Sequence, residues 1–551
     1  MPAQMQILLG ALLRLSSLTI TNHSRIRDVT IDVRSHLVLV GANDVGKTSI
    51  LRCLDMVLGS STAQLYGRLG VADFRNPEEE FVVEATMVHL SEFEKAHFPD
   101  EVHVNPKTDA TSLTVRLEVS LENEDVLQIR RFVPKGRSVR QVTREQLAAL
   151  GWKMIGAIQG GIRDFRDERN AALDDILAAI DFGEERSAFE EVNGRFQTHL
   201  DESAVLKNLR GDLAEQLSRA VPSLIREQDL SFVAGSVADN DLLADVRLQL
   251  TRNGIPRNMS EQSDGARALF AIALYDLVSA AANVVAIDEP EIHLHPSSQR
   301  SLARLLKSGS NQKIIATHSP EMVGAFSPDD IVVVKAGGVV VQPDLGFLSK
   351  ESKLAAQWWI SDKLEPLTSS RVIVVEGPSD RLVIRKAAEL FGYDLDRMGI
   401  SVVSLDGAGD VKMARAIFGP KGFDVPMSTL IDNDRAVNNV AKAYGISRSE
   451  FAAHDIYVST PDLEGEYVSA IGPEELKARL ASSTEFSTNK MKNCAPSTPA
   501  GKLTVDDVAK FCKTDKVLAA LVVVDGLSLS EAMAIPSLRD LLQNIEVAVA
   551  D

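Results

Sequence analysis

The octapeptide at residues 41–48 restricts the fold of this chain more than any other segment. It reads GANDVGKT, which fits the pattern G-x-x-x-x-G-K-[ST] without a gap. The apolar run HLVLV precedes it, and four apolar residues follow at helical spacing: Ile50, Leu51, Leu54 and Leu58. A buried strand, a glycine-rich turn and a helix in this order present backbone N–H groups at a helix N-terminus. The sequence therefore predicts an α/β fold with a site for nucleotide phosphates, and a helix from Lys47 to Leu58.

Side chains from three segments complete the predicted ATP site. Lys47 is expected to neutralise the β- and γ-phosphates, and the Thr48 hydroxyl to bind Mg²⁺. Asp288 and Glu289 end the apolar strand NVVAI, where they are expected to hold Mg²⁺ and to orient the attacking water. His318 follows the strand KIIAT and is expected to contact the γ-phosphate. The predicted site comprises Gly41, Asn43, Gly46, Lys47, Thr48, Ser49, Asp288, Glu289 and His318.

Four acidic residues follow two strands further along the chain. Glu376 ends the strand RVIVV and Asp380 lies one helical turn later, while Asp432 and Asp434 follow the strand STLI. The carboxyl ends of neighbouring parallel strands meet at one edge of a sheet, so these carboxylates should converge and repel one another unless a cation lies among them. Oxygen ligands suit Mg²⁺, with Mn²⁺ close behind. The sequence therefore predicts a divalent-metal site on a second parallel sheet.

Charge and cysteine content restrict the partners. The three cysteines lie far apart without a CxxC pair, which excludes a zinc ribbon and a disulfide framework. The formal net charge of −18 repels nucleic acid, so DNA contact requires a local basic patch and bridging cations. Six basic residues lie between positions 130 and 144 with no acid among them. They form either such a patch or a solvated β-hairpin.

The chain contains no apolar run near the length that spans a bilayer. The apolar stretch near its start follows no basic residue and is a poor signal peptide. We therefore expect a cytoplasmic protein without membrane contact.

Two further motifs connect this chain to a known family. Ser263-Asp264-Gly265 precedes an alanine-rich helix upstream of Asp288, as the signature loop does in ABC-type ATPases, although it reads QSDGAR and not LSGGQ. The strand end EG-x-x-D followed by D-x-D resembles the Toprim domain. In this order the two modules resemble the OLD (overcoming lysogenization defect) nucleases, many of which serve in bacterial anti-phage defence.

The resemblance implies an ABC-type P-loop ATPase head with a helical insertion, followed by a Toprim (Rossmann-like) α/β domain. In such heads ATP is sandwiched between two protomers. Ser263 and Gly265 would then act in trans, and the chain would form a homodimer or a higher homo-oligomer. The resemblance also allows a partner protein, such as a helicase or another defence protein, and leaves open whether ATP activates or inhibits cleavage.

For the Toprim domain, the resemblance implies metal-dependent cleavage or nicking of DNA. Glu376 would be the general base and a metal ligand, together with Asp380, Asp432 and Asp434. Glu464, from the segment Asp462-Leu463-Glu464, would complete a second metal site. A lysine near the end of the domain would stabilise the transition state. We choose Lys516 for this role, and Lys513 is the alternative candidate.

Five segments are expected: the N-terminal part of the ATPase domain (1–162), a helical insertion that serves dimerisation (163–234), the C-terminal part of the ATPase domain (235–346), a linker (347–370), and the Toprim nuclease domain with its C-terminal helices (371–551). Ordinary peripheral helices are the alternative for the insertion.

Other functions fit the sequence less well. A primase usually carries a zinc module, which the scattered cysteines exclude, and a topoisomerase needs a tyrosine on a separate domain, for which no segment is left. The alternative of a different class is a RecF- or SMC-like ATPase that acts as a DNA-binding sensor or clamp without cleavage. It would predict a degraded carboxylate set or long coiled-coil arms, and neither is present.

Overall fold

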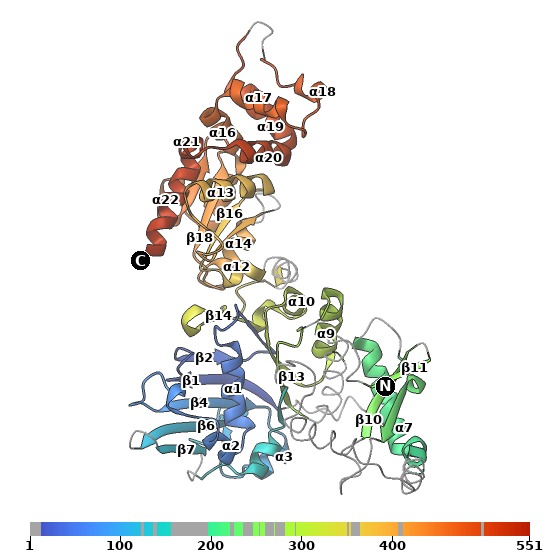
Figure 1. Cartoon of the computed structure of the whole chain (residues 1–551). Helices are drawn as coiled ribbons and strands as arrows, with labels where there is room; N and C mark the ends of the chain where they lie inside the picture. The colour runs from blue at the N-terminus through green and yellow to red at the C-terminus, as the bar shows by residue number, and fades with distance from the viewer. Residues whose placement is uncertain are drawn as a thin grey trace. The chain divides into compact units, whose positions relative to one another are not determined.

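The structure is a computed structural model of the full chain. It describes residues 13–122, 126–135, 140–155, 195, 197–220, 225–234, 246–252, 254–258, 269, 282–292, 294–349, 352–353, 364–405, 411–497 and 501–550. The chain divides into two compact units, Met1–Val340 and Val341–Asp551 (Figure 1). Among the described helices, none combines the length and the apolar character needed to cross a membrane.

A mostly parallel sheet forms the centre of the first unit. Six strands follow one another in the order β15 (Val339–Val341), β14 (Ile331–Lys335), β3 (Leu37–Val40), β13 (Gln312–Thr317), β12 (Val284–Asp288) and β8 (Trp152–Ile155). The strands from β14 to β8 run parallel. Every residue of β3, β12 and β13 is buried, as expected for strands covered on both faces. The predicted strands NVVAI and KIIAT are thus confirmed.

A second sheet of the first unit is antiparallel. Its strands follow the order β2 (Val29–Asp32), β1 (Arg14–Thr21), β4 (Phe81–Val88), β6 (Thr111–Glu122) and β5 (His103–Val104), and β7 (Val126–Phe132) also pairs with β6. Helix α1 (Lys47–Leu58) contacts strands of both sheets. Its apolar residues therefore belong to the core that joins the two sheets. The predicted helix has the predicted bounds.

The segment between β8 and β12 differs in part from the prediction. The described residues include helix α7 (Ala204–Ala220) and a three-stranded antiparallel sheet in the order β11 (Ile255–Asn258), β10 (Val246–Arg252) and β9 (Leu230–Ala234). The predicted helical pattern over 163–234 is wrong at its end, because LSFVA forms a strand that pairs with β10. Phe and Val favour a strand when a partner is present, and this partner lies later in the sequence. Residues 163–194 lie outside the described part.

The described part of the first unit has five more α-helices: α2 (Thr62–Tyr66), α3 (Glu92–His97), α4 (Arg144–Ala149), α9 (Pro296–Ser308) and α10 (Pro320–Val323). Helices α9 and α10 lie next to each other. They flank β13, whose carboxyl end leads into the Ser319 cap of α10.

The second unit contains a parallel sheet, as predicted. Its strands follow the order β17 (Ile400–Ser404), β16 (Arg371–Val375), β18 (Met427–Asp432) and β19 (Ile456–Ser459). The helices are α12 (Leu364–Thr368), α13 (Pro378–Leu390), α14 (Val411–Phe418), α15 (Arg435–Tyr444), α16 (Leu463–Ile471), α17 (Pro473–Ser482), α18 (Thr488–Met491), α19 (Val505–Cys512), α20 (Lys516–Gly526), α21 (Leu529–Met533) and α22 (Pro536–Ala550). Helix α20 packs on α13, and α22 packs on β19 (Figure 1).

Candidate functional site

Two glycines allow the loop before α1 to follow its path. A Cβ atom on Gly41 would lie 2.3 Å from the carbonyl oxygen of Val334. Gly46 has a φ of 113°, and a Cβ atom there would lie 2.3 Å from Cδ1 of Ile26. Both positions therefore require glycine. The loop ends at the N-terminus of α1, where free backbone N–H groups can bind a phosphate.

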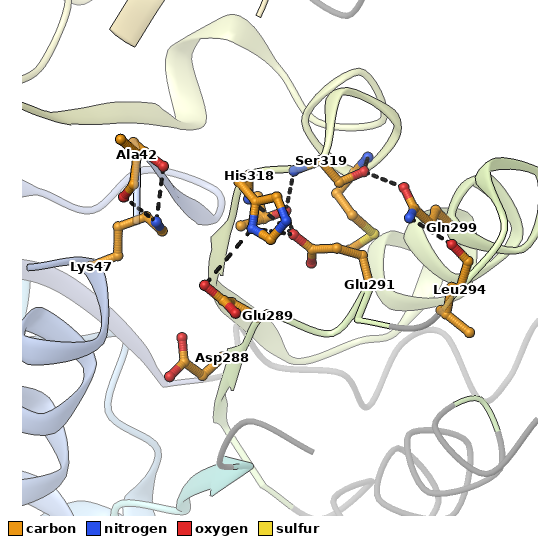
Figure 2. A network of polar contacts seen from close by, with 12 residues as sticks. Ala42, Lys47, Asp288, Glu289, Glu291, Leu294, Gln299, His318 and Ser319 are labelled. Atoms are coloured by element: carbon orange, nitrogen blue, oxygen red, sulfur yellow. Dashed lines mark hydrogen bonds and ion pairs between the residues drawn. The ribbon is translucent and has the colours of Figure 1, made fainter. Parts of the chain in front are cut away.

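Lys47 and Thr48, in the first turn of α1, lie near the end of β12. The Lys47 ammonium group donates to the carbonyl oxygens of Gly41 (2.9 Å) and Ala42 (2.8 Å) (Figure 2). The Thr48 hydroxyl donates to Oδ1 of Asp288 at 3.2 Å. Burial lowers the pKa of Lys47 and raises the pKa of Asp288. The structure thus brings together a cation, a hydroxyl and a carboxylate that a magnesium nucleotide would need.

Glu289 and His318 face each other beside this group (Figure 2). Nδ1 of His318 lies 3.8 Å from Oε1 of Glu289 and 3.6 Å from Oε1 of Glu291. Glu289 has a φ of 45°, a left-handed conformation that non-glycine residues rarely adopt and that often marks functional sites. Its N–H group donates to the carbonyl oxygen of Ala316 at 2.9 Å, so the turn after β12 is attached to β13.

The remaining predicted residues of this site are Asn43, Ser49, Ser263 and Gly265. Asn43 is exposed on the loop, and Ser49 is buried in α1. Ser263 and Gly265 lie outside the described residues, and their role in trans stays a prediction.

Glu291 is the residue of this site that the sequence prediction missed. It is buried, and its Oε1 accepts hydrogen bonds from the Thr317 hydroxyl (2.5 Å) and the His318 backbone N–H (2.9 Å). Its Oε2 is also buried and has no hydrogen-bond partner within the described ranges. The sequence offers one signal, because Glu291 is the third acid in the segment Asp288-Glu289-Pro290-Glu291.

The basic segment after residue 130 begins in a β-hairpin. Arg130 and Arg131 lie on β7, which pairs with β6. Arg131 is buried and donates to the carbonyl oxygens of Met56 and Ser60, while Arg130 forms an ion pair with Glu118. These two arginines therefore serve the fold, and Arg131 is not accessible to DNA.

The predicted carboxylates of the second unit lie at the ends of its strands. Oε1 of Glu376, directly after β16, accepts a hydrogen bond from the backbone N–H of Asp432, the last residue of the neighbouring β18 (2.9 Å). Asp380 lies in the first turn of α13 and accepts from the N–H of Gly377 at 2.9 Å. Asp434 caps helix α15 through its side chain. The structure therefore brings Glu376 and Asp432 together directly.

Glu464 and Lys516 belong to the same cluster. Nζ of Lys516, at the start of α20, lies 3.1 Å from Oε1 of Glu464 and 3.8 Å from Oδ2 of Asp432. Lys513 instead forms an ion pair with Asp462, the cap of α16. Of the two candidate lysines, Lys516 is thus the one that lies among the predicted metal ligands; its role in catalysis stays a prediction.

Burial and neighbouring charges shift the pKa values of this cluster. Burial and the nearby Glu376 raise the pKa of Asp432 to about 7. Burial also raises the pKa values of Glu376 and Asp380. Burial alone would lower the pKa of Lys516, but the nearby acids, Glu464 foremost, outweigh it and raise this pKa above its ordinary value.

The acid set fits a divalent cation in its chemistry. Glu464 is 2% exposed, and none of the described residues forms a hydrogen bond with its Oε2. A buried carboxylate oxygen without a partner, next to acids with raised pKa values, is what a cation would stabilise. In the described part of the chain, no three Asp, Glu, His or Cys side chains form a group that could hold a metal ion as they stand. The ammonium group of Lys516 lies between Asp432 and Glu464 in this arrangement.

Each of the two parts of the chain that carry these sites matches a family model. The family model described as "AAA domain, putative AbiEii toxin, Type IV TA system" matches residues 37–324. The family model described as "Overcoming lysogenization defect protein-like, TOPRIM domain" matches residues 367–434. The first match contains the candidate nucleotide site, and the second contains four of the candidate metal ligands.

Three relatives carry nuclease names. An OLD nuclease of Thermus scotoductus is 23% identical over 458 residues, which cover 76% of this chain and 82% of the relative. Endonuclease GajA of Bacillus cereus is 20% identical, with 68% of each chain covered. The Old nuclease of Escherichia phage P2 is 31% identical over 24% of this chain and 25% of its own length.

The two domains imply the use of a nucleotide and of a divalent metal. The first relative is similar over most of both chains, across the two domains. The chain therefore belongs to the OLD family of nucleases, with an AAA ATPase domain followed by a Toprim domain.

Proposed function

We propose that this chain is a DNA endonuclease or nickase whose Toprim site uses Mg²⁺ or Mn²⁺ and whose ATPase head regulates cleavage. The observation that carries the proposal is the acid cluster itself, in which Glu376 and Asp432 meet at adjacent strand ends beside Glu464 and Lys516. The nuclease names of the relatives support the same reaction class.

The metal would be held by strand-end and helix-start carboxylates: Glu376, Asp380, Asp432, Asp434 and Glu464. When bound, a divalent cation polarises the scissile phosphate and makes water a better nucleophile. Glu376 takes the proton of the attacking water. Lys516 stabilises the negative charge that develops on the phosphate oxygens.

The head binds ATP through the loop before α1. Lys47 neutralises the β- and γ-phosphates, and Thr48 with Asp288 holds the nucleotide's Mg²⁺. Glu289 orients the attacking water, and His318 contacts the γ-phosphate. The two side chains lie close enough to act on one phosphate group.

We also propose that ATP brings two heads together, with Ser263 and Gly265 of one protomer at the nucleotide of the other. The protein would then be a homodimer or a higher homo-oligomer. A measurement of mass in solution, with and without ATP, tests this directly, because a monomer under both conditions contradicts it.

A role in anti-phage defence is consistent with this activity, and a helicase or another defence protein is a candidate partner. We expect this activity in the cytoplasm.

Incubation of plasmid DNA with wild-type, Glu376→Ala and Lys47→Ala proteins tests the proposal. Each metal is added in turn, with and without ATP. Glu376→Ala should abolish cleavage and keep ATP binding, whereas Lys47→Ala should lose ATP binding and the response of cleavage to ATP. Glu389→Ala, which removes a 71% exposed acid on α13, is the matched control and should cut like the wild type. Cleavage by Glu376→Ala at the wild-type rate would refute the assigned chemistry.

A further inference from the structure

Glu291 joins the two turns that carry the predicted ATP-site side chains (Figure 2). It follows β12 two residues after Glu289, and its Oε1 holds the Thr317 hydroxyl and the His318 N–H group at the end of β13. The Thr317 hydroxyl oxygen in turn accepts from the N–H of Ser319 at 3.0 Å.

The network continues into helix α9. The Ser319 hydroxyl donates to Oε1 of Gln299 at 2.6 Å, and the side-chain amide of Gln299 donates to the carbonyl oxygen of Leu294 at 2.9 Å. Leu294 belongs to the turn after β12, and its N–H donates to the carbonyl oxygen of Glu291 at 3.0 Å. The hydrogen bonds therefore form a closed ring that attaches both turns to helix α9.

A glutamine would fill the hydrogen-bonding role of Glu291 without the cost of burying a charge. Glu291 is 3% exposed, and in the described part of the chain it has no ion pair with a lysine or arginine. Its Oε2 lacks a partner among the residues that the structure describes, and the residue lines a cavity of about 410 Å³ together with His318 and Ser319. The only cation-forming group within ion-pair distance in the described residues is the His318 imidazole, at 3.6 Å.

We propose that Glu291 is a positioning residue for ATP hydrolysis that acts through His318. The inference rests on the proposed ATPase function of the head. Glu291 holds the His318 backbone by a hydrogen bond. Nδ1 of the ring then faces Glu289 and Glu291, which leaves Nε2 to reach the γ-phosphate. The two carboxylates, 3.6 and 3.8 Å from Nδ1, attract this side of the imidazole electrostatically and favour this orientation of the ring.

Steady-state ATP hydrolysis by the full chain tests the proposal. Glu291→Ala should lower kcat about 10- to 100-fold, the range seen when a group that orients an active residue is removed, with KM for ATP unchanged. Glu291→Gln keeps an oxygen acceptor for Thr317 and His318. It should restore the melting temperature to the wild-type value and leave kcat low. Glu321→Ala, on the neighbouring α10, is the matched acid control and should hydrolyse ATP like the wild type.

A double-mutant cycle shows whether the effect passes through His318. In a His318→Ala background, the further change Glu291→Ala should leave kcat where His318→Ala alone puts it. An additional loss of the same size as in the wild-type background would overturn the proposal, as would full recovery of kcat by Glu291→Gln.

The experiment distinguishes a failure of the proposed ATPase function from a failure of this inference about Glu291. Absence of ATP turnover in the wild type overturns the ATPase function and this inference with it. Wild-type turnover that Glu291→Ala leaves intact, in a protein that still binds a fluorescent ATP analogue, overturns this inference alone.

Discussion

Removal of the Lys516 ammonium group should destabilise the Toprim unit in the absence of metal and strengthen its response to added metal. Lys516 is a counter-ion of Glu464 and Asp432 in the structure. A methionine at this position keeps most of the side-chain volume and leaves the Glu464 carboxylate buried without its cation. A bound divalent cation would then have no competing ammonium group.

The size of the effect follows from the geometry. Two unit charges 3.1 Å apart attract each other by about 5 kcal/mol at an effective dielectric constant of about 20, and by about 1 kcal/mol in water. Glu464 is buried, but the Lys516 side chain is 43% exposed, so solvent screening reduces the expected loss to about 2 kcal/mol. For a unit that spans residues 341–551, this corresponds to a fall in melting temperature of roughly 4–8 °C.

Calorimetry of the full chain in EDTA and in Mn²⁺ provides the measurement. Lys516→Met should melt below the wild type in EDTA and recover most of the difference in Mn²⁺. Lys513→Met is the matched control: it breaks the ion pair with Asp462, and its effect on melting should be the same with and without Mn²⁺. If Lys516→Met melts like the wild type in EDTA, or gains no more from Mn²⁺ than the wild type does, Lys516 is not a counter-ion of this cluster.

Three further changes test other parts of the structure. Burial, with Arg14 and Lys313 nearby, lowers the pKa of His36 to about 4. As the pH falls, the unfolded chain therefore binds a proton before the folded chain does, and the free energy of unfolding of the wild type should fall by up to about 3 kcal/mol between pH 6.5 and 4. His36→Asn should flatten this pH profile in urea unfolding. Gly46→Ala forces a side chain into a φ of 113° and should cost about 1–3 kcal/mol and abolish binding of a fluorescent ATP analogue; unchanged affinity would contradict the loop geometry. Ser537→Ala removes a 2.6 Å hydrogen bond to the buried Glu466 and should cost about 1.5–3 kcal/mol in urea unfolding; a loss below about 0.5 kcal/mol would show that this bond contributes little.

Local motifs allowed much of the fold and part of both sites to be predicted. The helix from Lys47 to Leu58 and the strands before Glu376 and Asp432 follow from short patterns of apolar residues, glycine and terminal acids. The contact between Glu376 and Asp432 could also be anticipated, because adjacent parallel strands end at the same edge.

Contacts that depend on the order of strands in space could not be predicted in this way. Glu291 meets Thr317 only because β12 and β13 are neighbours in the sheet, and nothing in the local sequence shows that pairing. The choice between Lys513 and Lys516 could not be made from the sequence for the same reason. Both lysines lie in the short connection between α19 and the start of α20, so their spacing in the sequence cannot separate them. The separation comes from their partners, Asp462 and Glu464, which lie on another helix.

The predicted ATP site and the acid cluster of the Toprim unit share one physical feature that favours ligand binding. Each contains a buried carboxylate with an oxygen that lacks a hydrogen-bond partner, Glu291 in the head and Glu464 in the Toprim unit. Such an oxygen costs about 1–3 kcal/mol in the ligand-free protein, and a ligand that supplies the missing partner gains that amount as binding energy. Glu464→Gln should therefore reduce the gain in melting temperature from Mn²⁺, because a neutral amide needs no cation. In EDTA it should melt below the wild type, because it loses the ion pair with Lys516. A variant that keeps the full Mn²⁺ response would show that Glu464 does not bind the cation.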